Sequence, residues 1–204
     1  MPGKHVRFAE STPSPSFTLS TLPSSGGPPT PLSAYGSQYC PLPAIATQVN
    51  PVLAREATPT LSWNLISSPQ EVRPTMPSSV SLDVLRQPAT NPPLPSMRIV
   101  SSQLPWTLTI TPQSGPFVTV GDFITGLYSS LRTSVTADEF SRIPTHSIQN
   151  AVRAAYINRC SLVQMRAEEE KAKGVKRIDF LCQKVRFMGL SSIGKDATFK
   201  LSVA

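Results

Sequence analysis

The chain has 204 residues, a length that suits one folded domain with a tail. Its net charge is +7. It contains no apolar stretch long enough for a transmembrane helix and no N-terminal apolar segment of the kind found in signal peptides. Its three cysteines (Cys40, Cys160 and Cys182) are far apart, and no Cys/His cluster accompanies them, which argues against a disulfide framework or a metal site. We therefore expect a cytoplasmic or nuclear protein with reduced thiols and without a cofactor, a metal or a membrane anchor.

Proline and charge divide the chain into unlike parts. Residues 1–95 hold 18 of the 22 prolines and a net charge of +1, whereas residues 96–204 carry +6. Residues 11–54 contain no Asp, Glu, Lys or Arg and are rich in Pro, Ser and Thr. Residues 1–44 hold too few apolar side chains to offset the entropy lost on folding, so we predict a disordered arm there. Residues 45–95 are predicted to be an extended, loop-rich segment that wraps the α+β core at 96–204.

The first predicted elements follow a rise in apolar density. Residues 61–65 alternate apolar and polar side chains, as a short half-buried strand does. Residues 81–86 can hold one or two helical turns. Two further strands are predicted at 97–100 and 106–110, separated by a turn near Pro105.

Two capping boxes predict the starts of helices. Thr119 and Asp122 open the first helix, and apolar residues follow at helical spacing: Phe123, Ile124, Leu127, Tyr128 and Leu131. Thr136 and Glu139 open a short second helix, whose inner side is predicted to carry Phe140 and Ile143.

The longest helix is predicted to begin at Pro144 and Thr145 and to end at Gly174, a residue that suits a helix C-terminus. Acidic residues followed by lysines at 168–173 favour its last turns. The apolar stripe of this helix comprises Ile148, Val152, Ala155, Tyr156, Cys160 and Val163.

The chain ends in three predicted strands at 176–181, 184–190 and 198–204, with a turn at 194–196. Together the elements predict an α+β fold. A small, mostly antiparallel sheet packs against two main helices, and the disordered Pro/Ser/Thr-rich arm precedes them.

Several short motifs stand in a distinctive order. LSWNL at 61–65 comes first, VTVGD at 118–122 opens a helix, and GVKRIDFL at 174–181 and FMGL at 187–190 come near the end. In this order the chain resembles a fungal, basidiomycete family known only as a domain of unknown function, over about residues 45–204. The resemblance implies a fold and a lineage but no activity. The residues that carry it, which we expect to be structural, are Trp63, Asp122, Gly174, Arg177, Asp179, Phe180, Leu181, Phe187 and Gly189.

The string KHVRF at residues 4–8 fits the docking pattern by which regulators hold type-1 protein phosphatase. In an extended peptide added to a sheet edge, Val6 and Phe8 point to the same side and can fill two apolar pockets. Lys4 would then meet acidic residues beside those pockets. The pattern is short, and the alternative is a basic, apolar N-terminus without this role.

Five Ser-Pro or Thr-Pro dipeptides are candidate sites for proline-directed kinases: Thr12, Ser14, Thr30, Thr58 and Ser68. Phosphates on Thr12 and Ser14 would bring negative charge close to Lys4 and Arg7 and would weaken docking. A Pro-, Ser- and Thr-rich segment also produces such dipeptides through its composition alone.

No catalytic motif is recognised. GLSSIGKD at 189–196 resembles a phosphate-binding loop, but Asp196 replaces the magnesium-binding Ser/Thr and a strand follows, so we assign a β-turn. Cys160 and His146 would lie about 21 Å apart on one helix, too far for a thiol–base pair. Asp179 is expected to form an ion pair with Arg177, Arg159 or Arg153.

The favoured interpretation is a non-enzymatic protein-interaction or adaptor protein. Its folded domain would bind a protein partner, and its phosphorylatable arm would recruit type-1 protein phosphatase. One alternative is a small ligand-binding or enzymatic domain with a site built from Trp63, Trp106, Arg153, Arg159 and Asp179. A second is a weak nucleic-acid binder, which the dispersed basic residues without interleaved aromatics disfavour. The sequence leaves the oligomeric state open.

Overall fold

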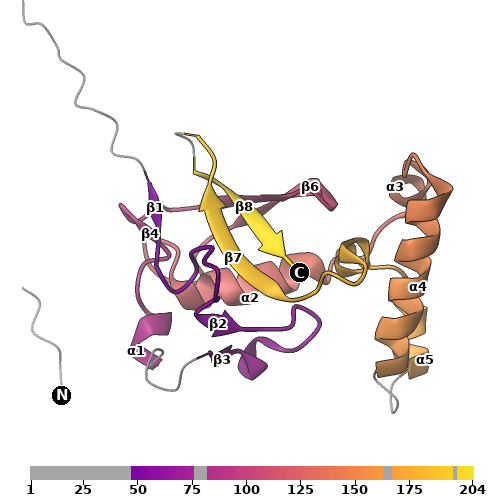
Figure 1. Ribbon diagram of the computed structural model, residues 1–204, viewed down its shortest axis with the longest axis horizontal. Helices are drawn as coiled ribbons and strands as arrows, with labels where there is room; N and C mark the ends of the chain where they lie inside the picture. The colour runs from indigo at the N-terminus through magenta and orange to yellow at the C-terminus, as the bar shows by residue number, and fades with distance from the viewer. Residues whose placement is uncertain (1–46, 76–81, 163–166, 195–196) are drawn as a thin grey trace, which may run out of the picture. The chain divides into compact units, whose positions relative to one another are not determined.

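The computed structural model describes residues 47–75, 82–162, 167–194 and 197–204 (Figure 1). The predicted arm therefore lies outside the described residues. The described part of the chain forms a four-stranded sheet, two small strand pairs and several helices. The predicted α+β class is confirmed.

The central sheet contains β5 (Met97–Ser101), β6 (Leu104–Ile110), β7 (Phe187–Ser192) and β8 (Thr198–Val203). Their order is β6-β5-β8-β7, with antiparallel pairs β5–β6 and β7–β8 and a parallel pair β5–β8. The predicted, mostly antiparallel sheet is confirmed. Lys195 and Asp196 of the turn predicted between β7 and β8 lie outside the described residues.

The turn between β5 and β6 lies earlier than predicted. Ser101 pairs with Leu104, so Ser102 and Gln103 form the turn and Pro105 lies within β6. Proline is tolerated there because β6 is an edge strand, and an edge strand can lack one backbone donor.

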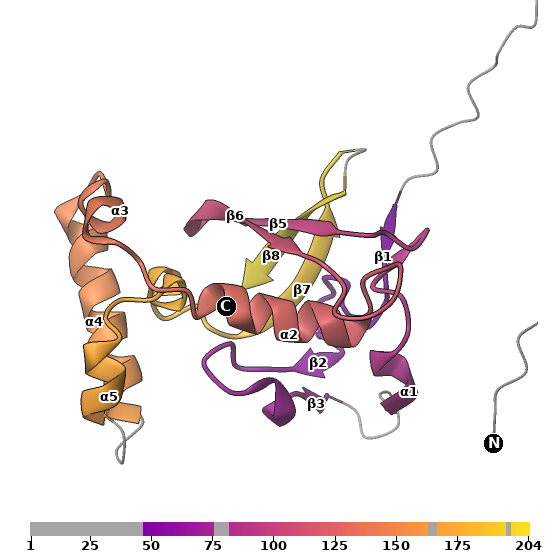
Figure 2. The ribbon, with the colours of Figure 1, turned by 180° about the vertical axis from the view of Figure 1, so that it is seen from behind.

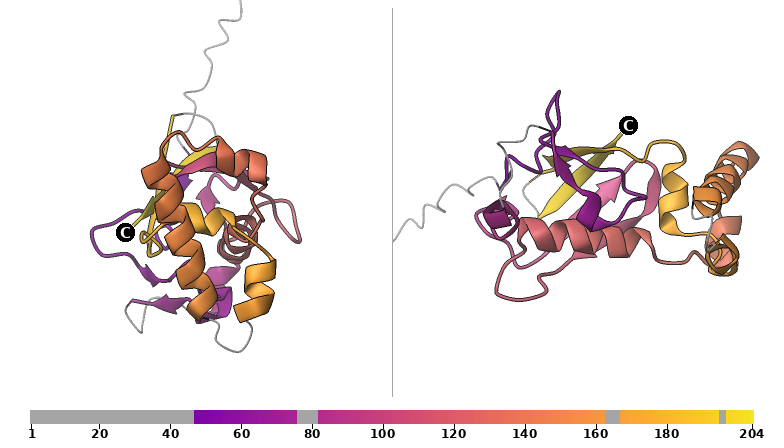
Figure 3. Two further views of the ribbon diagram at one scale, coloured as in Figure 1. Left: turned by 90° about the vertical axis from the view of Figure 1, so that its right-hand side faces the viewer. Right: turned by 90° about the horizontal axis from the view of Figure 1, so that it is seen from below.

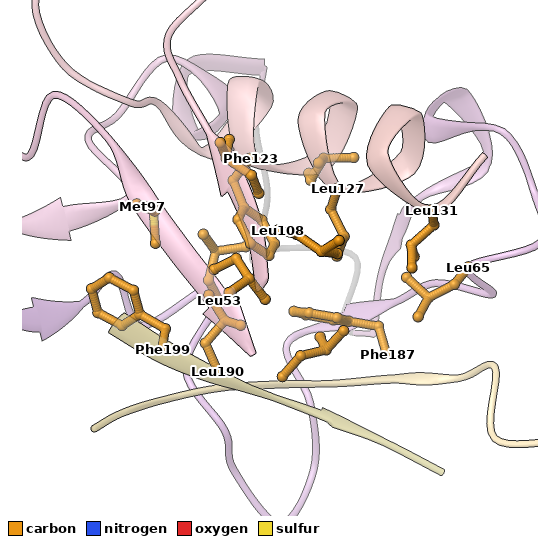
Figure 4. Close-up of a cluster of buried hydrophobic side chains, with 14 of the residues drawn as sticks. Leu53, Leu65, Met97, Leu108, Phe123, Leu127, Leu131, Phe187, Leu190 and Phe199 are labelled. Atoms are coloured by element: carbon orange, nitrogen blue, oxygen red, sulfur yellow. The ribbon is translucent and has the colours of Figure 1, made fainter. Parts of the chain in front are cut away.

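Helix α2 (Val120–Leu131) begins at the predicted capping box. The Asp122 N–H donates to Thr119 Oγ1, and the Thr119 N–H donates to Asp122 Oδ2, both at 3.0 Å. Figure 2 shows α2 lying across the sheet, and Figure 4 shows its apolar side chains pointing into the core. The strands bury alternate residues toward this helix, so the core lies between α2 and one face of the sheet.

The described residues before β5 form two small antiparallel pairs and two short helical segments. Strand β1 pairs with β4, and β2 pairs with β3. The helix predicted within 81–86 is confirmed as the single turn α1. The bounds are β1 (Gln48–Val49), β2 (Leu61–Ser62), η1 (Pro69–Glu71), β3 (Arg73–Pro74), α1 (Leu82–Leu85) and β4 (Thr90–Asn91).

This part of the chain covers the outer edge of β7. The Leu190 N–H donates to the Leu53 carbonyl at 2.7 Å, and the Phe187 N–H donates to the Trp63 carbonyl at 2.9 Å. The cover satisfies backbone groups that would otherwise invite pairing with another chain. It also buries Leu53, Leu61, Trp63 and Leu65 in the common core.

The alternation predicted for residues 61–65 is confirmed by burial. The apolar residues at 61, 63 and 65 are buried, and the polar residues at 62 and 64 are exposed. Only Leu61 and Ser62 form a regular strand.

Helix α3 (Ala137–Ser141) begins at the second predicted capping box. The Thr136 N–H donates to Glu139 Oε2 at 2.9 Å, and the Glu139 N–H donates to Thr136 Oγ1 at 3.2 Å. Phe140 and Ile143 pack half-buried against the core, as predicted.

The single helix predicted from Pro144 to Gly174 is wrong. The structure has α4 (His146–Leu162) and α5 (Ala167–Ala172), and α5 folds back beside α4 (Figure 3). Tyr156 Oη donates to the Lys171 carbonyl at 2.9 Å. A continuous helix would separate these two residues by about 22 Å along its axis. With α5 beside α4, Glu170 of α5 reaches the buried Arg159 of α4.

The apolar stripe predicted for this helix is partly wrong. Val152 and Cys160 are buried, but Ile148 is 46% exposed, and Val163 lies outside the described residues. Helix α4 packs mainly on α5 and on residues 177–181 rather than on the sheet, and the Ile148 side chain stays exposed. None of the described helices is long and apolar enough to cross a membrane.

The strand predicted at 176–181 is wrong as well. Residues Arg177–Leu181 form the 3-10 helix η3. Asp179 Oδ2 accepts the Lys176 backbone N–H at 2.8 Å, which closes the first helical turn. Burial does not alternate, because 178 to 181 are all buried. Figure 3 shows η3, in gold, between α4 and the end of α2, and η3 also contacts β6.

Gly189 is expected to be hard to replace. Its φ is 102°, and an added Cβ would lie 2.4 Å from the Ala54 carbonyl oxygen. Gly189→Ala should therefore lower the free energy of unfolding by about 3 kcal/mol or more, because backbone strain and a clash add together. Chemical denaturation measures this loss.

Gly115→Ala is the matched control for this prediction. Gly115 has a φ of 95° with nothing within 4 Å of an added Cβ, so this variant measures backbone strain alone, about 1–2 kcal/mol. Equal losses in the two variants would contradict the proposed clash with the cover over β7.

Candidate functional site

A buried ion pair joins α4 to η3. The guanidinium of Arg159, 1% exposed, donates from Nε to Asp179 Oδ1 at 2.8 Å and from Nη2 to Oδ2 at 3.0 Å. Asp179 is 2% exposed. Such a bidentate pair is stronger and more directional than a single contact. It is one of the three pairings that the sequence allowed for Asp179.

The same guanidinium also holds α5 and the residues after it. Nη1 of Arg159 donates to Glu170 Oε2 at 2.8 Å, and Nη2 donates to the Gly174 carbonyl at 3.0 Å. Burial alone would lower the pKa of Arg159, but the hydrogen bonds and charge of Asp179 outweigh it and raise this pKa. Arg159 is therefore a permanent cation with partners on every nitrogen.

Glu170 connects this pair to two lysines. Its Oε1 accepts from Lys173 Nζ and its Oε2 from Lys176 Nζ, both at 2.8 Å. These hydrogen bonds lower the pKa of Glu170 to about 2. Glu170 was not among the site residues predicted from the sequence, because a straight helix would carry it away from Arg159.

The residues proposed for an enzymatic site do not all meet. Trp63 is 2% exposed and packs in the core with its ring centroid 6.0 Å from that of Phe187. Arg153 is exposed and lies over the Phe140 ring at 5.5 Å. Only Arg159 and Asp179 of the five come together, and they use their polar atoms on each other and on their neighbours.

Trp106 belongs to a separate cluster beside η3. Its Nε1–H donates to Glu139 Oε1 at 2.8 Å, the Phe180 ring meets it edge-on at 4.8 Å, and the Arg177 guanidinium lies 4.9 Å from its ring. The hydrogen bond from the Thr136 backbone lowers the pKa of Glu139 most, and the Trp106 N–H lowers it further. This carboxylate is thus ionised and already occupied on both oxygens.

The other residues singled out from the sequence lie either outside the described residues or at separate places in the fold. Lys4, Val6, Phe8, Thr12, Ser14 and Thr30 lie outside the described residues. Thr58 is exposed, and Ser68 is half-buried at the N-cap of η1. Leu181, Phe187 and Gly189 are buried. His146 and Cys160 lie at opposite ends of α4.

Two open cavities lie beside α4. Their volumes are about 570 Å³ and about 650 Å³, and their linings share Gln103 and Phe180. We call the two together the α4 groove and name its halves after Trp106 and Cys182, which line one half each. In the described part of the chain no three His, Cys, Asp or Glu side chains gather as metal ligands would.

Small and apolar side chains of α4 form one wall of the groove. Ile148 lines the Trp106 half, and Ala151, Ala154, Ala155 and Asn158 line the Cys182 half. The opposite wall comes from the β5–β6 turn, η3 and the residues that lead into β7. Sequence reasoning missed this groove. The run of alanines on one side of α4 is the signal that could have indicated it, because alanine leaves space beside a helix.

Cys182 is a half-buried thiol in the wall of the groove. Burial raises its pKa, and the charge of Asp179 raises it further. The protonated thiol is a poor nucleophile, so Cys182 contributes an apolar surface to the groove.

The comparison with protein families assigns the described domain to a family. The chain belongs to DUF6699, a family of unknown function, whose model matches residues 61–197. The expected domain of unknown function is thereby confirmed over most of the folded part. Neither the curated proteins nor the solved structures contain a match to this chain.

Removal of one partner of the buried pair should destabilise the protein strongly. Asp179→Asn is expected to lower the free energy of unfolding by about 3–5 kcal/mol, because it leaves the Arg159 charge buried and less compensated. Chemical denaturation checks this value. Glu168→Gln, which breaks only the exposed pair with Lys171, is the control and should change little.

The double variant Arg159→Met/Asp179→Leu tests whether the uncompensated buried charge causes this loss of stability. It removes both charges together and is expected to recover much of the stability that Asp179→Asn loses. A double variant that is as unstable as Asp179→Asn would contradict the ion pair as the cause.

Glu170 should make stability depend on pH in the acid range. Its folded pKa of about 2 lies below its ordinary value of 4.5, so the folded state binds fewer protons than the unfolded chain between these values. The contribution of Glu170 is therefore complete above about pH 4.5 and is lost as the pH falls toward 2. Denaturation midpoints measured across this window should fall less steeply in Glu170→Gln, whereas an unchanged slope would contradict the shift.

Proposed function

We propose that this protein is a non-enzymatic protein-interaction protein, an adaptor whose folded domain binds a partner and whose arm recruits a phosphatase. The observation that carries the proposal is the α4 groove. It is open, lined mainly by apolar and small side chains, and bordered by an Ile148 side chain that is 46% exposed. Exposed apolar surface of this kind is typical of protein interaction sites.

The state of the polar residues supports binding over catalysis. Arg159 and Asp179 are buried against each other, and Glu139 is held by Trp106 and Thr136. A catalytic acid, base or nucleophile needs free access to a substrate and a pKa near the working pH. The groups that line the α4 groove offer neither a thiolate at Cys182 nor a free carboxylate at Glu139.

The arm supplies the second half of the proposal. Lys4, Val6 and Phe8 form the docking segment for type-1 protein phosphatase, with Val6 and Phe8 in two apolar pockets of that enzyme. Phosphates on Thr12 and Ser14 would weaken this docking through their charge. The proposal includes a cytoplasmic or nuclear location and a fungal origin, supported by the separated cysteines and by the resemblance to basidiomycete proteins.

The docking segment can be tested with purified components. Full-length chain immobilised on a biosensor should bind the catalytic subunit of a fungal type-1 phosphatase, and Val6→Ala/Phe8→Ala should weaken binding by about 100-fold or more. Phe17→Ala, a like change elsewhere in the arm, is the control and should leave affinity unchanged. Absent binding, or equal binding by both variants, would contradict the recruitment of this phosphatase.

A further inference from the structure

The exposed cations in the lining of the α4 groove point to the chemistry of its partner. We propose that the groove binds a short peptide segment of a partner protein that combines apolar residues with acidic residues. This inference deepens the proposed function and rests on it, because it names the ligand class of the same surface.

The lining of the groove favours a ligand with apolar side chains. Phe180 forms the divide between the two halves, with Ile143 and Ile148 on the Trp106 side and Val185 on the Cys182 side. Ala151 projects only a methyl group, so a peptide backbone can come close to α4 at that point. Apolar side chains placed in the two halves would remove this surface from water.

Each half of the groove is lined by an exposed cation. Arg142 lines the Trp106 half and Lys184 the Cys182 half, and both side chains are exposed. Neither forms an ion pair with any residue that the structure describes. Glu139, the acidic group in the lining, is ionised, and its oxygens already accept hydrogen bonds from Trp106 and Thr136. With Arg142 and Lys184 against Glu139, the charged side chains of the lining leave an excess of one positive charge toward an incoming ligand.

Charge also disfavours the two occupants that this chain could supply itself. The segment KHVRF at residues 4–8 is basic, and residues 11–54 carry no charged side chain that could meet Arg142 or Lys184. A second copy would bring a domain whose residues 96–204 have a net charge of +6. An acidic segment from another protein is the complementary ligand.

The length of the groove sets the length of the segment. From Ile148 to Asn158, α4 contributes ten residue steps, or about 15 Å of wall. About five residues of extended peptide or about ten residues of helix span that distance. A displayed library of 12-residue peptides covers both conformations.

The test selects random 12-residue peptides on full-length protein and measures the affinity of the enriched sequences as synthetic peptides. We expect apolar residues together with Asp or Glu. Arg142→Glu/Lys184→Glu should weaken these peptides about tenfold, because two attractive pairs become repulsive. Arg86→Glu/Lys200→Glu changes the net charge equally at exposed positions outside the groove and should stay within about twofold.

A second pair of variants places the peptides in the groove. Ala151→Trp fills it from an exposed position of α4 and should abolish binding, whereas Ile157→Trp, on a side of α4 that does not line it, should not. Thermal denaturation monitored by circular dichroism establishes that each variant is folded.

Several results would overturn the inference. Enriched peptides without acidic residues, or peptides unaffected by Ala151→Trp, would contradict the inference, while the protein-interaction function would still stand on phosphatase binding. Basic peptides like KHVRF would assign the groove to the arm, and a dimer abolished by Ala151→Trp would assign it to a second copy. No enrichment together with no phosphatase binding would overturn this inference and the proposed function alike.

Discussion

The arrangement of the C-terminal half of this domain depends on one buried cation, the guanidinium of Arg159. It draws three segments together, because Asp179 lies in η3, Glu170 in α5 and the Gly174 carbonyl just beyond α5. A guanidinium buried without these partners would destabilise the fold by several kcal/mol. Since η3 in turn contacts α2 and β6, the ion pair links α4 to the core, alongside the buried Val152 side chain of α4. The α4 groove forms because the middle and last turns of α4 pack on the rest of the domain, whereas the side of α4 that carries Ala151 lines an open cavity.

Local signals in the sequence were sufficient for much of the fold. Helices α2 and α3 were predicted from the capping boxes at Thr119 and Thr136 and from the apolar residues that follow them. These interactions involve neighbours in the chain, so they can be recognised in the sequence. Alternation predicted the strands of the central sheet in the same way. The strand at 176–181 and the continuous helix to Gly174 were wrong for a common reason. Both errors concern residues around Asp179 and Glu170, whose conformation is set by the distant Arg159 and not by local preference.

The candidate site was only partly accessible to sequence reasoning. Pairing of Asp179 with one of three arginines was expected, and the structure selects Arg159. The α4 groove has walls from residues near 66, 103, 151, 180 and 184, which are brought together only by the tertiary fold. Its apolar lining and the exposed cations Arg142 and Lys184 are the features from which we propose a protein ligand. The proposed adaptor role thus joins a structured binding surface to a docking motif in the arm.

Hydrogen–deuterium exchange tests most directly whether the Arg159–Asp179 pair holds α4 in place and thereby forms the groove. In Asp179→Asn under native conditions, amides of α4, α5 and η3 should lose protection, while amides of α2 and the central sheet keep theirs. This pattern would show that the Arg159–Asp179 pair holds α4, α5 and η3 in place. Protection lost equally across the whole domain, or retained in α4, would contradict it.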